Sequence, residues 1–223
     1  SYVNCKVLER PMEYNIWRAP TDNDRNIKNI WRKAKYDKIV TRAYRTDYTV
    51  LEEEVQIHTV LSVSAVIIQR ILDIDATWTI HANGRIDVKL DVKKDPEFPE
   101  LPRFGLRLFL PRDMADITYY GLGPVESYQD KRRASYHDEF HAAVKELHED
   151  YIRPQENGSH DDCDYVKAEG SRISLAAVGA DTFAFNASVY TQEELTEKAH
   201  NYELKASPYT VFCLDYRQNG IGS

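Results

Sequence analysis

The most regular pattern of apolar and polar positions lies at residues 85–92, where the two kinds alternate strictly. The apolar positions are Ile86, Val88, Leu90 and Val92. Successive side chains of a strand point to opposite faces, so we expect these four on one buried face and the charged residues on the other. Asn83 and Gly84 precede this run, and Asn-Gly is the favoured two-residue hairpin turn, because both residues tolerate positive φ. The pattern therefore predicts a hairpin between residues 77–80 and 85–92.

Short apolar segments recur elsewhere with turns between them. They are residues 55–61, 65–74, 106–110, 117–120, 173–178, 183–189 and 210–216. Strand-like runs at roughly 8–12-residue spacing are typical of a sandwich or barrel. Pro96, Pro99 and Pro102 break any strand between residues 92 and 104, so we expect an ordered loop there.

Helical patterns are few. Thr191 and Glu194 form a capping box that predicts a helix start, and residues 27–36 suit a short amphipathic helix with Ile30, Trp31 and Ala34. No repeat, linker or low-complexity segment is visible. We predict one all-β domain over residues 1–223, a mainly antiparallel two-sheet sandwich with less than about a fifth helix.

Composition narrows the class of function. The chain has 223 residues, of which 42% are hydrophobic and 29% charged, with a formal net charge of -7. This negative net charge gives no indication of a positively charged surface that would bind nucleic acid or an anionic membrane. No apolar run approaches the roughly 18 residues that a membrane helix needs, and no signal peptide is visible. Cys5, Cys163 and Cys213 lie far apart without a CxxC pair, which favours reduced thiols in a cytoplasmic protein.

The segment WRAPTDND at residues 17–24 carries the densest candidate chemistry. Trp17, Arg18, Asp22, Asn23 and Asp24 suit a polar platform that stacks on or hydrogen-bonds a neighbour, or a packed turn that ties a loop to the core. We expect Arg18 to be partly buried and paired with a carboxylate of Asp22, Asp24 or Glu156, because a buried guanidinium needs partners for its five donors. Trp17 should lie against the sheet and exclude water from that pair.

The second candidate region follows Pro154. Gln155, Glu156 and Asn157 precede Gly158, and such a loop either binds sugar hydroxyls or, as we prefer, satisfies buried backbone groups. His160, with Glu156, Asp161 and Asp162, suggests a metal site or an acid/base pair, but acids near a turn are usually solvated and we predict no metal here. The loop after residue 121, with basic residues 131–133, is either a domain contact or a solvated surface.

Five segments in a fixed order carry a resemblance to a known family. They are WRAPTDND at 17–24, LPRFGLR at 101–107, YGLGPVESY at 120–128, YIRPQENG at 151–158 and YTQEEL at 190–195. Together they resemble the C-terminal domain, or small chain, of the beta-galactosidases of glycoside hydrolase family 2. The resemblance spans about residue 12 to Ser223.

The resemblance implies a large supersandwich similar to galactose mutarotase, truncated here at both ends. It implies a retaining enzyme that hydrolyses terminal β-D-galactosyl residues, with catalytic glutamates on a separate barrel and none on this chain. The chain would then support the barrel, shape the edge of its pocket and help to assemble a homo-oligomer. We expect no cofactor on this chain, while the parent enzyme is expected to use divalent or monovalent metal ions.

Some members of the family place an aromatic residue of this domain at the edge of the sugar pocket, just beyond the Gly-Ile-Gly segment that ends here at residue 222. Ser223 is the last residue, so that aromatic has no counterpart to name. The rival interpretation is a free-standing carbohydrate-binding module, and an unrelated sugar epimerase comes third. A barrel encoded upstream would favour the first interpretation, and glycan binding by the chain alone would favour the second.

Overall fold

A computed structural model describes residues 4–67 and 69–222 of the chain. Strands account for 52% of it and helices for 11%, so the prediction of an all-β protein with two antiparallel sheets and short helices is confirmed. The chain folds into two compact units, one made of residues up to 28 and from 101 onward and the other of residues 29–100. A single domain over residues 1–223 stays a prediction.

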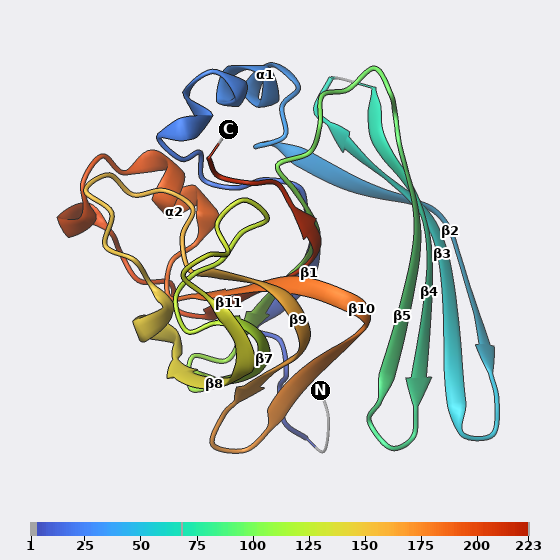
Figure 1. The fold of residues 1–223 in the computed structure, drawn as a ribbon. Helices are drawn as coiled ribbons and strands as arrows, with labels where there is room; N and C mark the ends of the chain where they lie inside the picture. The colour runs from blue at the N-terminus through green and yellow to red at the C-terminus, as the bar shows by residue number, and fades with distance from the viewer. Residues whose placement is uncertain (1–3, 68, 223) are drawn as a thin grey trace. The chain divides into compact units, whose positions relative to one another are not determined.

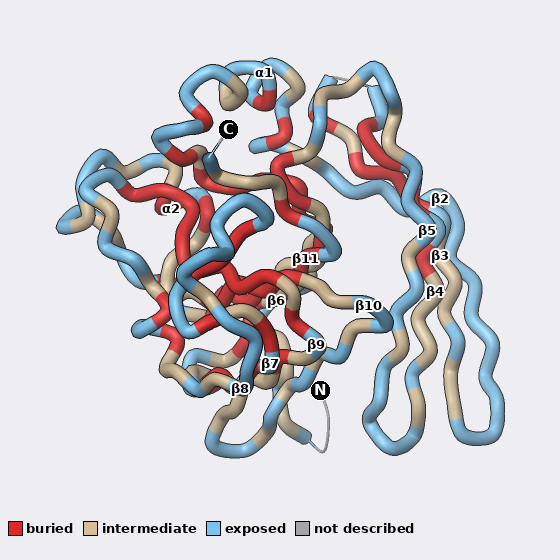
Figure 2. Tube along the Cα trace, in the orientation of Figure 1, coloured by how far each residue is buried: buried red, intermediate tan, exposed pale blue. Residues whose placement is uncertain are grey.

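The larger unit is built on a seven-stranded antiparallel sheet with the order β1-β6-β11-β10-β9-β7-β8 (Figure 1). In chain order its strands are β1 (Arg10–Asn15), β6 (Arg103–Leu110), β7 (Asp116–Gly123), β8 (Tyr136–Ala143), β9 (Ser159–Glu169), β10 (Ser174–Ser188) and β11 (Thr210–Gln218). Alternate residues of β7 are buried, as its sequence pattern demands. The core of this unit gathers Tyr119, Cys163, Phe185 and Phe212, and Figure 2 shows how buried chain concentrates around β6, β7 and β11.

Short helical segments complete this unit. They are η1 (Asn23–Arg25), η2 (Val144–Leu147), α2 (Gln192–Glu197) and η3 (Asn201–Glu203). Thr191 caps α2, because its hydroxyl accepts the Glu194 N–H at 3.1 Å, so the predicted helix start is confirmed. The reciprocal half of the capping box is absent among the described residues, since Glu194 Oε1 instead accepts the N–H of Lys205.

The smaller unit is a four-stranded antiparallel sheet with the order β2-β3-β4-β5. Its strands are β2 (Ile39–Val50), β3 (Glu54–Ala65), β4 (Arg70–His81) and β5 (Ile86–Lys94). The predicted hairpin exists, but its turn has three residues, because His81 N donates to Arg85 O and only Gly84 has positive φ. The runs predicted at 65–74 and 77–80 are divided differently, because Ala65 ends β3, a turn follows it, and the single long strand β4 covers residues 70–81.

The apolar positions of β5 share one face with those of β4, since Val88 is opposite Trp78 and Leu90 is opposite Ala76. The predicted alternation is therefore confirmed. Their predicted burial is wrong for Ile86, Val88 and Val92, each of which stays more than a third exposed.

Helix α1 (Ile27–Lys33) is shorter than predicted and buries Trp31, whereas Ile30 is exposed. The Trp31 indole donates to Glu100 O at 3.1 Å, and the Tyr36 hydroxyl donates to Pro99 O, so the proline-rich segment is ordered as expected. No helix among the described residues is long and apolar enough to cross a membrane.

Candidate functional site

Arg18 lies in the loop that follows β1 and is 1% exposed. Its Nε and Nη2 donate to the two carboxylate oxygens of Asp24 at 3.1 and 2.7 Å, the fork geometry that a guanidinium favours. The same carboxylate accepts the Thr21 N–H at 2.9 Å and thereby closes the turn into η1. The predicted buried pair is confirmed, and Asp24 is the partner among the three candidates.

The rest of the Arg18 guanidinium binds main chain at residues 219–222, which we call the clasped segment. Nη1 donates to Asn219 O at 2.7 Å and Nη2 to Gly220 O at 2.8 Å. Asn23 Nδ2 donates to Ile221 O at 2.8 Å. On the other side, the Asp130 carboxylate accepts the N–H groups of Ile221 and Gly222 at 2.9 and 2.6 Å. Side chains from distant parts of the sequence therefore hold this segment by its backbone.

A second buried guanidinium lies at the start of β6. Arg103 donates from Nε and Nη2 to Asp215 of β11, at 3.0 and 2.5 Å, and from Nη1 to Glu156 Oε2 at 3.1 Å. Gln218 Nε2 donates to the other oxygen of Glu156 at 3.1 Å. Burial raises the pKa of both carboxyl groups, and the guanidinium acts against that rise. Glu156 is thus joined to β6 through Arg103 and to β11 through Gln218.

The loop at residues 155–158 satisfies backbone groups, as we preferred. Gln155 Oε1 accepts the Asp22 N–H at 3.0 Å. Asn157 Oδ1 accepts the Glu149 N–H, and its Nδ2 donates to the carbonyl of Gln155. Gly158 has a φ of 69°, and a Cβ there would lie 2.2 Å from Leu147 O, so only glycine fits.

His160 does not join this group. It is 1% exposed in β9, between Tyr119 and Phe185, with ring centroids 4.6 and 5.2 Å away. Its Nδ1 lies 3.1 Å from Leu122 O. Burial lowers the pKa of this imidazole to about 4, so the ring is neutral at physiological pH. The expectation that His160 contributes to a ligand or domain contact has no support in this placement.

Trp17 is buried, and its indole donates to Thr196 of α2 at 3.2 Å. That its ring excludes water from the arginine pair stays a prediction. Asp161 is mostly buried in β9 and accepts a hydrogen bond from Arg132 at 2.6 Å, so the expectation that the acids near this turn are solvated is wrong for it. The described residues contain no group of three or more His, Cys, Asp or Glu side chains arranged to hold a metal ion.

The candidates that do converge line a hollow of about 420 Å³, which we call the polar hollow. Its lining comprises Thr21, Asp22, Asn23, Asp130, Lys131, Tyr151, Gln155, Glu156, Ile221 and Gly222. The sequence interpretation identified four of these, Asp22, Asn23, Gln155 and Glu156, as candidate site residues. The lining also includes Ile221 and Gly222 of the clasped segment. Residues of the 17–24 segment, of the loop at 155–158 and of the clasped segment therefore form one site.

The buried carboxylate of Glu126 binds two side chains that line the polar hollow, Lys131 and Tyr151. Glu126 accepts hydrogen bonds from Lys131 Nζ, from the Tyr151 hydroxyl and from the Gly158 N–H, the last at 2.7 Å. Sequence reasoning named neither Tyr151 nor Asp130 as a site residue. Both lie next to or within the family-like segments, but nothing in their spacing shows that they meet.

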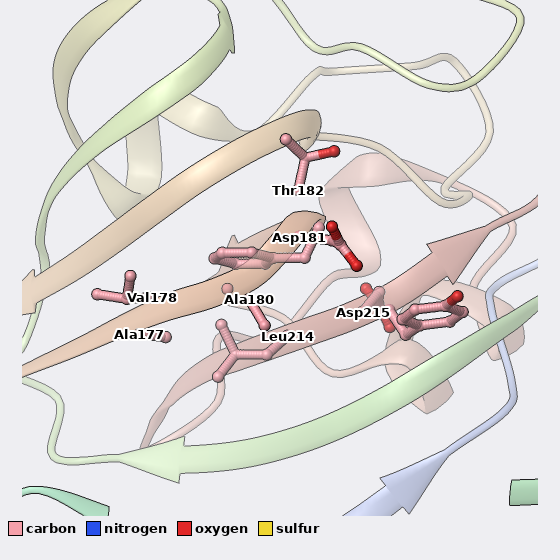
Figure 3. Close-up of a pocket in the computed structure, with 10 residues that line it drawn as sticks. Ala177, Val178, Ala180, Asp181, Thr182, Leu214 and Asp215 are labelled. Carbon is pink, nitrogen blue, oxygen red and sulfur yellow. The ribbon is translucent and has the colours of Figure 1, made fainter. Parts of the chain in front are cut away.

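A second hollow, of about 270 Å³, lies beside the irregular part of β10 (Figure 3). Ala177, Val178 and Leu214 supply apolar walls, while Asp181 and Asp215 contribute carboxylates. The Asp215 carboxylate is paired with Arg103, and none of the candidate site residues named from the sequence lines this hollow. We therefore base the functional interpretation on the polar hollow.

Comparison with known proteins gives a consistent result. A family model described as "Beta galactosidase small chain" matches residues 1–223. A beta-galactosidase of Actinobacillus pleuropneumoniae is 43% identical over 217 residues, which are 97% of this chain and 21% of that protein. One from Staphylococcus xylosus is 39% identical over 222 residues, covering 99% of this chain and 22% of that protein.

A third relative, the beta-galactosidase of Lactobacillus delbrueckii subsp. bulgaricus, is 31% identical over 225 residues, again 99% of this chain and 22% of that protein. The chain thus spans about a fifth of the length of these curated relatives.

Proposed function

The chain belongs to the beta-galactosidase small chain family, and we propose that it is the C-terminal domain of a retaining beta-galactosidase that hydrolyses terminal β-D-galactosyl residues. The observation that carries the proposal is the family match over residues 1–223, in a chain that covers 21% of a relative named beta-galactosidase. The remaining length of such an enzyme has room for a catalytic barrel.

The pairing and burial of three acidic side chains support the proposal that the catalytic glutamates lie outside this chain. Retaining hydrolysis requires two carboxyl groups about 5 Å apart that both reach the sugar. The buried acids Asp24, Glu156 and Asp215 are each bound to a guanidinium and have side chains at most 3% exposed. A carboxylate held in this way has neither the access nor the free oxygen that a nucleophile needs.

The role that we propose for this chain is to support the catalytic barrel and to complete the edge of the barrel's sugar-binding pocket. The polar hollow is the surface we assign to that role, because its walls are hydrogen-bonded into one shape before any partner arrives. We propose that the parent enzyme works as a homo-oligomer, uses metal ions held outside this chain and resides in the cytoplasm, where its free cysteines stay reduced.

The test compares the full reading frame, which should encode a barrel upstream, with the 223-residue chain. The full enzyme should hydrolyse nitrophenyl β-galactoside and release the β-anomer first, as NMR of the fresh product would show. The chain alone should give no turnover. Turnover by the purified chain that Glu156→Gln abolishes and Glu149→Gln preserves would overturn the assignment, since Glu149 is an exposed acid of the same region.

A reading frame that encodes no barrel would favour the free-standing carbohydrate-binding module instead. In that case the chain should bind β-galactosides without hydrolysing them. The reading frame therefore separates the two functions before any assay is run.

A further inference from the structure

The four-stranded sheet of the smaller unit has two unlike faces. At the end of the sheet that carries the two hairpin turns, one face presents only apolar side chains, which the strand register places together and which we call the open apolar face. Its members are Tyr48, Val50, Trp78, Ile80, Ile86 and Val88. The opposite face carries charged side chains such as Asp75, Asp87 and Lys89. An amphipathic antiparallel sheet of this kind packs its apolar face against another layer.

The open apolar face is exposed to solvent, although the same side of the sheet is buried at its other end. There Leu61, Ile74 and Ala76 are at most 5% exposed, whereas Tyr48 is 73% and Val50 66% exposed. Figure 2 shows the same change along β3 and β4, from buried chain at one end to half-buried or exposed chain at the other. The apolar pattern of these strands thus specifies more burial than the structure provides.

The size of this surface marks it as a docking site. Together with the half-buried Trp78, the five exposed side chains of the open apolar face leave on the order of 600 Å² of apolar surface in water, as much as the largest patch on a typical monomer. Tyrosine and tryptophan are among the residue types that carry most of the binding energy of protein interfaces.

The absence of charge from the open apolar face identifies a partner. A two-fold axis lays a surface on an identical surface, so a charged side chain near the axis meets its own copy. None of the six members of this face is charged, so two copies of it meet without repulsion. Packed face to face, they remove on the order of 1,200 Å² from water, which reaches the lower end of the range of specific, stable interfaces.

We propose that the open apolar face packs against the same face of a second copy of this chain, so that two four-stranded sheets form one sandwich across a two-fold axis. This interface rests on the homo-oligomer of the proposed function and names a surface for it. It requires neither the barrel nor hydrolysis, so a failure to associate and a failure to hydrolyse galactosides are separate results.

The experiment measures the mass of the 223-residue chain by analytical ultracentrifugation from about 1 to 300 μM. We expect a monomer–dimer equilibrium with a dissociation constant on the order of 10 μM. Tryptophan fluorescence gives a second measurement. Trp17 and Trp31 are buried within one copy, so a shift of the emission to shorter wavelength with rising concentration reports the burial of Trp78.

Val88→Lys should weaken dimerisation about 100-fold, because it places an ammonium group in the desolvated centre of each half of the interface. Val60→Lys is the matched control. Val60 lies on the opposite face of the sheet, where it is 37% exposed against 41% for Val88, and its replacement should leave the dissociation constant unchanged. Tyr48→Ser changes a side chain that is mostly in solvent, so the fold should persist while dimerisation weakens about tenfold.

Three results overturn the proposal: a chain that stays monomeric up to about 300 μM, equal weakening by Val88→Lys and Val60→Lys, or a dimer in which the tryptophan emission does not shift. In the longer enzyme, Val88→Lys should lower the mass of the oligomer. An oligomer of unchanged mass refutes the proposal, and if its stability falls as well, another part of the same polypeptide covers the open apolar face.

Discussion

Two guanidinium groups are buried to the same extent in this chain, and they reach that state in different ways. Arg18 pairs with Asp24, six residues away, inside one turn. Arg103 pairs with Glu156 and Asp215, which are 53 and 112 residues away. The sequence interpretation foresaw the first pair and missed the second. A pair within one turn is visible as a motif, whereas a pair between segments depends on strand order.

The two groups also use their remaining donors differently. Arg18 directs them to the carbonyls of the clasped segment, so it orders a piece of main chain. Arg103 directs all its observed bonds to carboxylates, so it joins β6, β11 and the loop at residues 155–158. We infer that Arg103 matters most for the stability of the unit, and Arg18 most for the shape of the polar hollow.

The largest expected effect is that of Arg103→Met, which leaves two buried carboxylates without their cation. Stranding buried charge in this way typically costs 3–5 kcal/mol per broken pair, so we expect a loss of about 5 kcal/mol in the free energy of unfolding. Urea denaturation of the chain measures it. Arg85→Met is the control, because Arg85 pairs with Asp87 on the surface, where solvent screens the pair, and its replacement should leave the free energy of unfolding nearly unchanged. A loss of similar size in both variants would contradict the comparison.

Arg18→Ala should cost less, about 3 kcal/mol, because it strands one acid, Asp24. Arg18→Lys should not restore stability, since an ammonium cannot bind both carboxylate oxygens and two carbonyls from one plane. The same denaturation series tests both variants. Full recovery with lysine would show that charge alone, rather than the fork geometry, holds the clasped segment.

The pH response should be the smallest effect. Burial raises the pKa of Glu156 and Asp215, so the folded chain binds these protons more tightly than the unfolded chain. The stability that they contribute is present below the unfolded pKa and is lost as pH rises through the folded pKa. Without the guanidinium the rise in pKa is greater, so the destabilisation by Arg103→Met should be larger at pH 8 than at pH 5. Unfolding curves at both pH values test this, and equal losses would mean that the two acids are not the stranded charges.

The parts of the fold that could be predicted from the sequence are those that rest on local pattern. The alternation in β5, the hairpin before it and the Thr191 cap are properties of a few adjacent residues. β9 was missed, because its run of polar residues at 159–164 has no strand-like alternation. Within that run Asp161 pairs with Arg132 and the Ser159 hydroxyl with Gln218, and both partners come from other segments of the chain.

In the candidate site, too, contacts between residues close in the sequence could be predicted and contacts between distant segments could not. Arg18 with Asp24 and the backbone role of Asn157 could be predicted, because each is completed within a few residues. Asp130 could not be predicted, because its partners lie 91 and 92 residues away in the clasped segment. His160 was a candidate because its neighbours in the sequence are polar, whereas two of its neighbours in space are the aromatic rings of Tyr119 and Phe185.

The contact between Asp130 and the clasped segment has an evolutionary consequence. A Cβ added at Gly220 would lie 2.5 Å from Asp130 Cγ, and one added at Gly222 would lie 2.8 Å from Asp130 Oδ2. Either glycine can acquire a side chain only if the aspartate shrinks or withdraws, and a shorter residue at 130 gives up two backbone hydrogen bonds. A substitution at either glycine therefore changes the effect of a substitution at Asp130, and this coupling links the mutational histories of two loops some ninety residues apart.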